Sequence, residues 1–241
     1  GQEIVGDSSY VTNTNVLRTV VSSTSGTFEV LDFAPRYRAA REIRAPIELV
    51  RLLRPLEGSP RVTVDFDPRP DFSLAPVSLH DEGGAITVRG GTEPFHLATN
   101  VPVSFVLGKT PFTLRDPVFF SFSCGTRPTE SALPSVHRAL EETIFGWRAW
   151  AKTCALPTFA PNAVLRSALC MKLHVYEDTG AIIAATTTSI PEALGTQRCW
   201  DYRYCWLRDA AFVVEALRRL SHLAEGERFI RFLRHVAESG P

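Results

Sequence analysis

The chain has 241 residues, and its 26 Lys and Arg residues balance its 26 Asp and Glu residues. Hydrophobic residues make up 44% and charged residues 22% of the sequence, which excludes a disordered chain. The zero formal net charge argues against a nucleic-acid partner bound through a broad basic surface. No uncharged apolar run reaches the length of a membrane-spanning helix, so no membrane insertion is predicted.

The five cysteines form no CxxC pair, and their spacing is irregular. This pattern predicts reduced thiols in a cytoplasmic protein and favours neither a disulfide framework nor a zinc site. The first ten residues lack the basic region and apolar run of a signal peptide. The six histidines show no HxH or HExxH spacing, so no metal site is predicted.

The chain up to about residue 130 has the pattern of short strands separated by turns. Two β-rich runs, up to Ser22 and over residues 27–33, flank turn residues and predict a hairpin. Residues 47–53 and 62–66 predict a second pair, because apolar side chains alternate in 62–66. Further strands are predicted at residues 86–89, 102–107 and 118–123. Together these strands predict a sandwich of antiparallel sheets.

After residue 130 the apolar residues recur at steps of three and four, which is typical of helices. The first helical stripe consists of Val136, Leu140, Ile144, Trp147 and Ala151. A second helix is predicted to start at Pro161, with Leu165, Leu169, Leu173 and Tyr176 on one face, and to end at Gly180. Residues 181–194 are predicted to be irregular.

Two further helices are predicted near the end of the sequence. The third starts at Asp209, with Val213, Ala216 or Leu217, and Leu220 facing inward. Glu215 and Arg219 can pair on its outer face. The fourth covers residues 225–238, with Phe229, Leu233 and Val236 facing inward. Strands followed by helices predict an α+β chain with two domains.

One segment, CWDYRYCWLRD over residues 199–209, is chemically unusual. Residues 200–209 contain two residues each of Trp, Tyr, Arg and Asp, directly before a predicted helix. Aromatic faces can pack on sugar rings, while Asp and Arg hydrogen-bond to vicinal hydroxyls. Structural interpretations remain open: Asp209 can cap the helix, Arg208 can pair with a carboxylate, and Trp206 can belong to the core.

The string WDYRYCWLRDA (residues 200–210), preceded by GAIIAATTTSIPEALG (residues 180–195), resembles the signature of glycoside hydrolase family 15. This family includes glucoamylases and a microbial branch of trehalases. The N-terminal phrases TNVLR, VLDFAP and DFDPRPD, at residues 14–18, 30–35 and 65–71, resemble the trehalase branch.

The resemblance implies an N-terminal antiparallel β-sandwich over residues 1–127 and a linker helix over residues 128–160. Residues 161–241 would then be the first part of an (α/α)6 barrel. It implies an exo-acting, inverting enzyme that releases glucose from an α-linked glucan or from trehalose. No cofactor is implied, since glycoside hydrolysis needs only an acid, a base and water.

The resemblance also implies the roles of single residues. Tyr202 would pack near the scissile ring, and Trp206 would support it with its indole. Arg208 and Asp209 would bind the hydroxyls of the terminal glucose. For Trp200 and Arg203, a supporting role in the site and plain packing are both open.

No general acid or base is identified in this sequence; in the family both lie in later helices, so we expect them beyond residue 241. We expect that this chain is a truncated form that begins inside the sandwich domain. By their pattern, four glutamates are predicted to be solvated: Glu215, Glu225, Glu227 and Glu238. The alternative function is a catalytically silent carbohydrate-binding or assembly module. The choice between trehalose and other α-glucosides, and the oligomeric state, remain open at this point.

Overall fold

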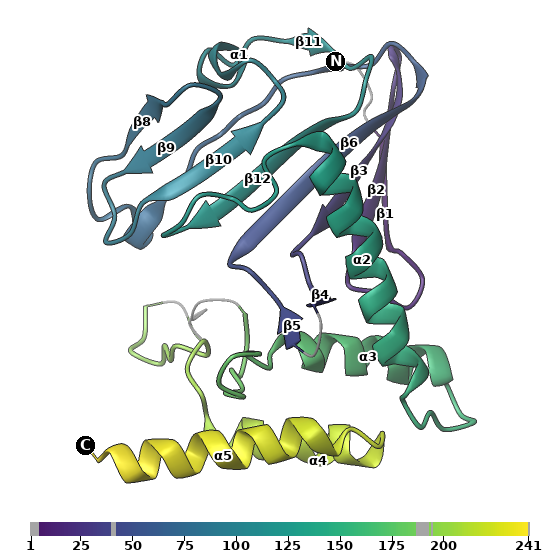
Figure 1. The fold of residues 1–241 in the computed structure, drawn as a ribbon, viewed down its shortest axis with the longest axis vertical. Helices are drawn as coiled ribbons and strands as arrows, with labels where there is room; N and C mark the ends of the chain where they lie inside the picture. Colours follow the sequence, from purple (N-terminus) through teal and green to yellow (C-terminus); the bar gives the residue numbers. More distant parts are fainter. Residues whose placement is uncertain (1–4, 40–41, 187–192, 194, 241) are drawn as a thin grey trace. The chain divides into compact units, whose positions relative to one another are not determined.

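A computed structural model describes residues 5–39, 42–186, 193 and 195–240 of the chain. The chain divides into two compact units, residues 1–147 and 148–241. The first unit is built on strands and the second on helices (Figure 1). The limits predicted from the sequence, 1–127, 128–160 and 161–241, stay predictions. Within the described residues, no helix combines the length and the apolar character needed to cross a membrane.

The first unit contains an antiparallel sheet of eight strands (Figure 1). Along the sheet they follow the order β1 (Val5–Tyr10), β2 (Leu17–Ser23), β3 (Gly26–Phe33), β6 (Glu48–Gly58), β12 (Val118–Cys124), β10 (Phe95–Thr99), β9 (Ala85–Arg89) and β8 (Ser78–Asp81). Two small sheets pair β4 (Tyr37–Ala39) with β5 (Glu42–Arg44), and β7 (Arg61–Val62) with β11 (Phe112–Thr113). The structure confirms an α+β fold with an antiparallel sheet. The sequence predicted a sandwich of sheets, whereas the eight strands of the large sheet are joined in one continuous sheet.

Both faces of the eight-stranded sheet are buried, because neighbouring residues of one strand enter different core clusters. Phe119 and Leu52 belong to one cluster, whereas Phe120 and Leu53 belong to the other. The first cluster also contains Val136, Ala139 and Leu140 of helix α2 (Leu133–Lys152), which therefore covers that face. The predicted stripe of α2 is confirmed, since its five residues are buried or half-buried.

The hairpin predicted around the turn after Ser22 is confirmed, because β2 and β3 pair in register from Leu17–Asp32 to Ser23–Gly26. The predicted pairing of residues 47–53 with 62–66 is wrong. Strand β6 lies between β3 and β12. Of the second run only Val62 lies in a strand, β7, which pairs with β11. The alternation in residues 62–66 is nevertheless confirmed, since Val62, Val64 and Phe66 pack against the second cluster although the run lies outside the large sheet.

The strand predicted at residues 102–107 is wrong, because Val103–Leu107 forms the short helix α1. Its two buried side chains, Val103 and Val106, are three residues apart, which matches a helical turn and not a strand. A short apolar run does not by itself distinguish the two structures.

The second unit consists of α3 (Pro161–Leu173), α4 (Leu207–Arg219) and α5 (Leu223–Ser239), together with the last residues of α2. Its core cluster contains Val175, Ile182, Ala210, Leu217 and Phe229. Each of the three predicted helices exists, but their boundaries differ. Helix α3 ends at Leu173, and the following chain turns back to form a bridge between Val175 and Ile182.

Three apolar residues predicted to face inward are exposed. Leu173, the last residue of α3, is 44% exposed. Tyr176 lies beyond the end of α3 and is 48% exposed, and Val236 on α5 is 50% exposed. Part of the irregular segment 181–194 lies outside the described residues. The outer pair on α4 is confirmed, because Arg219 Nε lies 2.8 Å from Glu215 Oε1.

Candidate functional site

The segment that the sequence singled out forms the loop that leads into α4. Helix α4 begins at Leu207, with Trp206 in an extended conformation at the preceding position and no side chain capping the helix. Asp209 therefore lies in the first turn and does not cap the helix. An acidic residue there interacts favourably with the helix dipole. The two predicted site residues of the helix, Arg208 and Asp209, thus follow directly after the end of the loop.

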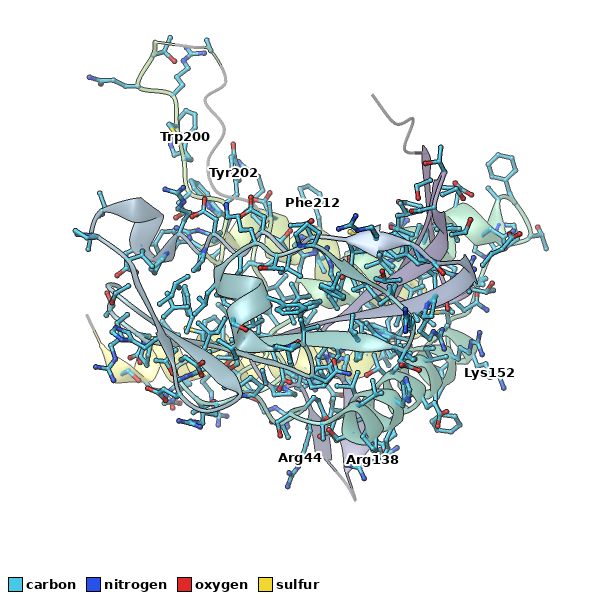
Figure 2. All side chains as sticks on the ribbon, turned by 90° about the horizontal axis from the view of Figure 1, so that it is seen from above. Arg44, Arg138, Lys152, Trp200, Tyr202 and Phe212 are labelled. Carbon is cyan, nitrogen blue, oxygen red and sulfur yellow. The ribbon has the colours of Figure 1, made fainter. Side chains whose placement is uncertain are left out.

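Tyr202 and Trp206 lie next to each other in the structure. Their ring centroids are 6.1 Å apart, and the ring planes are tilted by 32°. Both residues are half-buried, so each ring keeps some surface open to a ligand. Figure 2 shows Tyr202 at the base of the loop and Trp200, which is 42% exposed, farther along it. The two rings form an aromatic surface of the kind that packs on the apolar face of a sugar.

Arg208 connects this aromatic surface to a carboxylate. Its guanidinium carbon lies 6.0 Å from the centroid of the Trp206 ring, within the range of a cation–π contact. Its Nη2 atom lies 3.0 Å from Oδ2 of Asp209. The Arg208 side chain is 67% and that of Asp209 31% exposed, so both can reach a ligand. The structure therefore brings Tyr202, Trp206, Arg208 and Asp209 into one cluster.

Two residues near this cluster form an ion pair in the same loop. The Nη2 atom of Arg203 lies 2.6 Å from Oδ2 of Asp201. Hydrogen bonds from the Arg203 side chain and backbone hold the pKa of Asp201 below its ordinary value. The sequence left Arg203 undecided and did not assign Asp201. A D-x-R spacing inside a loop is the signal that points to such a pair.

A buried group of charges lies elsewhere in the second unit. The ammonium of Lys172, whose side chain is 1% exposed, lies 2.9 Å from Oε1 of Glu225 and 3.2 Å from Oε2 of Glu177. Arg228 Nη1 lies 2.7 Å from Glu177 Oε1. The prediction that Glu225 is solvated is wrong, because its side chain is only 5% exposed. Helical periodicity does not reveal a carboxylate that is buried with a cation from another helix.

The buried charges adjoin a thiol and an imidazole. The Sγ atom of Cys154 lies 3.1 Å from Nε2 of His222, and His222 stacks on Trp150 with centroids 4.2 Å apart. Burial lowers the pKa of His222 below its ordinary value, although Glu225 opposes this change. Burial, together with the charge of Glu225, raises the pKa of Cys154 to about 11. The raised pKa keeps Cys154 in the neutral thiol form near pH 7, so Cys154 is not an activated nucleophile.

Other sequence predictions concern thiols and metals. All five cysteines are free, and Cys205 packs against the core cluster of the second unit. Among the described residues, no group of three or more His, Cys, Asp or Glu side chains is arranged to hold a metal ion.

Residues in both units match known protein families. Residues 158–240, which include the whole cluster, match the family described as glycosyl hydrolases family 15. Residues 4–109 match the family described as trehalase-like, N-terminal. The resemblance to glycoside hydrolase family 15 is confirmed. The (α/α)6 barrel that the family implies stays a prediction, because the described helices of the second unit are few.

Several curated proteins are similar to parts of this chain. A trehalase of Thermoplasma acidophilum is 45% identical over 91 residues, which are 38% of this chain and 16% of the relative. Trehalases of Mycolicibacterium smegmatis and Mycobacterium tuberculosis are each 29% identical over 202 residues, which are 78% of this chain and 30% of the relative. The chain thus spans less than a third of the length of these relatives. No solved structure matches the chain significantly.

Proposed function

We propose that the protein carrying this chain is a glycosidase that hydrolyses trehalose, and that the cluster around Trp206 binds one of its glucose rings. The observation that carries the proposal is the joint placement of Tyr202, Trp206, Arg208 and Asp209 at the start of α4. The family match of residues 158–240 supports a glycosidase. The trehalase-like match of residues 4–109 and the relatives named trehalase favour trehalose over the starch-type glucans of a glucoamylase.

Each residue of the cluster has a role in this proposal. The rings of Tyr202 and Trp206 pack against the apolar face of the glucose ring. The Arg208 guanidinium donates hydrogen bonds to vicinal hydroxyls, and the Asp209 carboxylate accepts hydrogen bonds from them. Because these groups recognise a terminal sugar, the enzyme would be exo-acting. The charges of Arg208 and Asp209 cancel, because the two side chains form an ion pair at 3.0 Å. A site without net charge suits an uncharged ligand such as a sugar.

Inverting hydrolysis requires a general acid and a general base on opposite sides of the scissile bond. The buried carboxylates of the second unit are unsuited to either role. Glu177 and Glu225 are engaged by Lys172 and Arg228 and lie in the interior of the helical unit. We therefore assign the acid and the base to none of the described glutamates of this network. No cofactor is needed for the reaction.

The proposal is tested by the affinity for sugars and by trehalose hydrolysis in the full natural protein. Trehalose, maltose and glucose are titrated calorimetrically against the wild type and against the variants Arg208→Ala and Asp209→Ala. Removing one hydrogen bond to a charged group should weaken binding about 10- to 150-fold, since such a bond contributes roughly 1.5–3 kcal/mol. The same variants should lower kcat/KM for trehalose.

The matched control is Arg218→Ala. Arg218 lies on the same helix and is also exposed and paired with a carboxylate, at 2.7 Å from Glu215, but it is outside the cluster. Its substitution should leave sugar affinity unchanged. Unchanged affinity and turnover in the Arg208 and Asp209 variants would refute the site. Sugar binding without any hydrolysis would refute the enzyme and favour a carbohydrate-binding module.

A further inference from the structure

The loop before α4 is closed by the side chain of Asp201. Its Oδ1 atom accepts hydrogen bonds from the backbone N of Arg203 at 2.9 Å and from Arg203 Nε at 3.0 Å. Its Oδ2 atom accepts a hydrogen bond from Arg203 Nη2 at 2.6 Å. One carboxylate therefore binds both the backbone and the forked side chain of the residue two positions later. This arrangement fixes a local turn, as Asp does in an Asx-turn, and adds a bidentate ion pair.

The same residue also holds the indole of Trp206. The Nε1–H group of Trp206 donates a hydrogen bond to the carbonyl oxygen of Asp201 at 3.0 Å. An indole has a single donor and no acceptor, so this bond determines the direction in which the ring edge points. The ring so held is the one that lies beside Tyr202 and under the guanidinium of Arg208.

The rest of the loop backbone is also anchored. The carbonyl oxygen of Tyr202 accepts a hydrogen bond from the backbone N of Ala185 at 2.8 Å, and that of Tyr204 accepts one from Ala184 at 3.3 Å. These bonds tie the middle of the loop to a neighbouring segment. Neither of these two bonds involves the carbonyl of Asp201, at the start of the loop. The orientation of that carbonyl therefore depends on the turn that the Asp201 side chain closes.

We propose that Asp201 and Arg203 are positioning residues, whose ion pair sets the turn that aims the Trp206 indole and so determines the affinity of the sugar site. The inference rests on the proposed function for its effect on sugar binding, but not for its effect on Trp206. Neither residue touches the ligand in this proposal. Both act through the backbone carbonyl at position 201.

The solvent exposure of the Asp201–Arg203 ion pair distinguishes a positioning role from a contribution to the stability of the fold. The side chains of Asp201 and Arg203 are 27% and 44% exposed. An ion pair in contact with solvent contributes little to the free energy of unfolding. Loss of the pair should therefore leave the stability of the chain almost unchanged, while the Trp206 ring loses its fixed direction.

The first readout follows the indole directly. In the ¹⁵N-labelled protein, the indole N–H resonance of Trp206 is assigned by its disappearance in Trp206→Phe. In Asp201→Ala we expect this resonance to shift and its hydrogen exchange with solvent to accelerate, because the turn that orients the acceptor is lost. In Asp201→Asn the amide oxygen can still accept the bond from the Arg203 backbone, so we expect a partial return toward the wild type.

The second readout is the affinity for trehalose and the KM of the full natural protein. Asp201→Ala should weaken binding about 5- to 20-fold, which is roughly the loss of one to two kcal/mol, and should raise KM more than it lowers kcat. Arg203→Lys keeps the charge but removes the planar fork, so it should show a smaller loss of the same kind. The melting temperature of each variant should stay close to that of the wild type.

Glu215→Ala is the matched control, because Glu215 also bonds two arginines on the surface of the same unit, at 2.7 and 2.8 Å, without contacting Trp206. It should move neither the indole resonance nor the affinity. An unmoved indole resonance and unchanged affinity in both Asp201→Ala and Arg203→Lys would overturn the positioning role. If Asp201→Ala fails to fold, Asp201 is a structural residue and the proposal is overturned for it, while Arg203→Lys tests its partner.

The two proposals fail differently. If Arg208→Ala binds trehalose as well as the wild type, the sugar site is wrong, although the indole resonance still reports on the turn. If Arg208→Ala loses affinity but Asp201→Ala keeps both affinity and resonance, the sugar site stands and the positioning role is wrong.

Discussion

The ammonium of Lys172 lies 2.9 Å from Oε1 of Glu225 in the interior of the helical unit, where the two side chains are 1% and 5% exposed. Lys172 belongs to α3 and Glu225 to α5, so the pair joins two helices. Glu177 and Arg228 complete a group of two cations and two carboxylates. The network carries no net charge, which is what makes its burial tolerable.

Lys172→Met should therefore destabilise the protein strongly. The substitution keeps the length of the side chain but leaves two buried carboxylates with one cation, which costs about 3–5 kcal/mol for a broken buried pair. Chemical denaturation measures the loss. The control Arg234→Met removes one side of an exposed pair with Glu238 on α5 and should have no measurable effect. Equal stability of Lys172→Met and the wild type would contradict the role of the network.

The stability of the protein should fall as the pH drops below about 6.5. Burial lowers the pKa of His222 in the folded state, so below its ordinary value of 6.5 the unfolded chain binds a proton that the folded chain does not. Burial raises the pKa of Glu225, but Lys172 and further hydrogen bonds outweigh burial and lower it, so a second loss follows below pH 4.5. Urea unfolding between pH 8 and about pH 3 measures both.

A variant of His222 tests the assignment of the first step of this pH profile. His222→Gln should flatten the profile between pH 6.5 and 5, because it removes the group whose pKa differs between the folded and unfolded states. His235→Gln is the control, since His235 is exposed on α5. A His222→Gln profile that follows that of the wild type over this range would show that His222 does not cause the first step.

The thiol of Cys154 should resist alkylation in the folded protein. Burial and the charge of Glu225 raise its pKa to about 11, so at pH 8 only about one thiol in a thousand is the reactive thiolate. Cys170 and Cys199 are exposed and should react first. Iodoacetamide labelling followed by peptide mass spectrometry measures the order. Labelling of Cys154 at the rate of Cys199 in folded protein would contradict its hydrogen bond to His222.

Gly180→Ala should destabilise the turn that joins α3 to the bridge at Ile182. Gly180 has a φ of +83°, and an added Cβ would lie 2.7 Å from the backbone of Arg228. The left-handed conformation alone costs about 1–2 kcal/mol for a residue with a Cβ, and the contact with α5 adds to it. Gly195→Ala is the control, because its φ is +78° but no atom lies within 4 Å of the added Cβ.

Thermal unfolding compares the two glycine variants. Gly195→Ala should show only the cost of the backbone conformation, and Gly180→Ala a clearly larger loss. Equal losses of stability in both variants would mean that the Arg228 backbone moves away from the added Cβ without a free-energy cost.

The sequence by itself determined the features that depend on neighbouring residues. The β2–β3 hairpin and the inner face of α2 follow from a local turn and a repeat of three and four residues. The four residues at the start of α4 were indicated by the resemblance to glycoside hydrolase family 15, and they lie within eight positions of one another. A short loop that enters a helix can place such residues together without help from distant parts of the chain.

Only the tertiary structure decided the contacts between residues far apart in the sequence. Strand β6 pairs with β3 and β12 and not with the run that follows it, because burial of both sheet faces selects the partner. Glu225 has the pattern of a surface residue, yet it is buried, because Lys172 from another helix supplies the charge that its burial requires. A one-dimensional pattern records the direction of a side chain on its own helix, but not which distant charge meets it there.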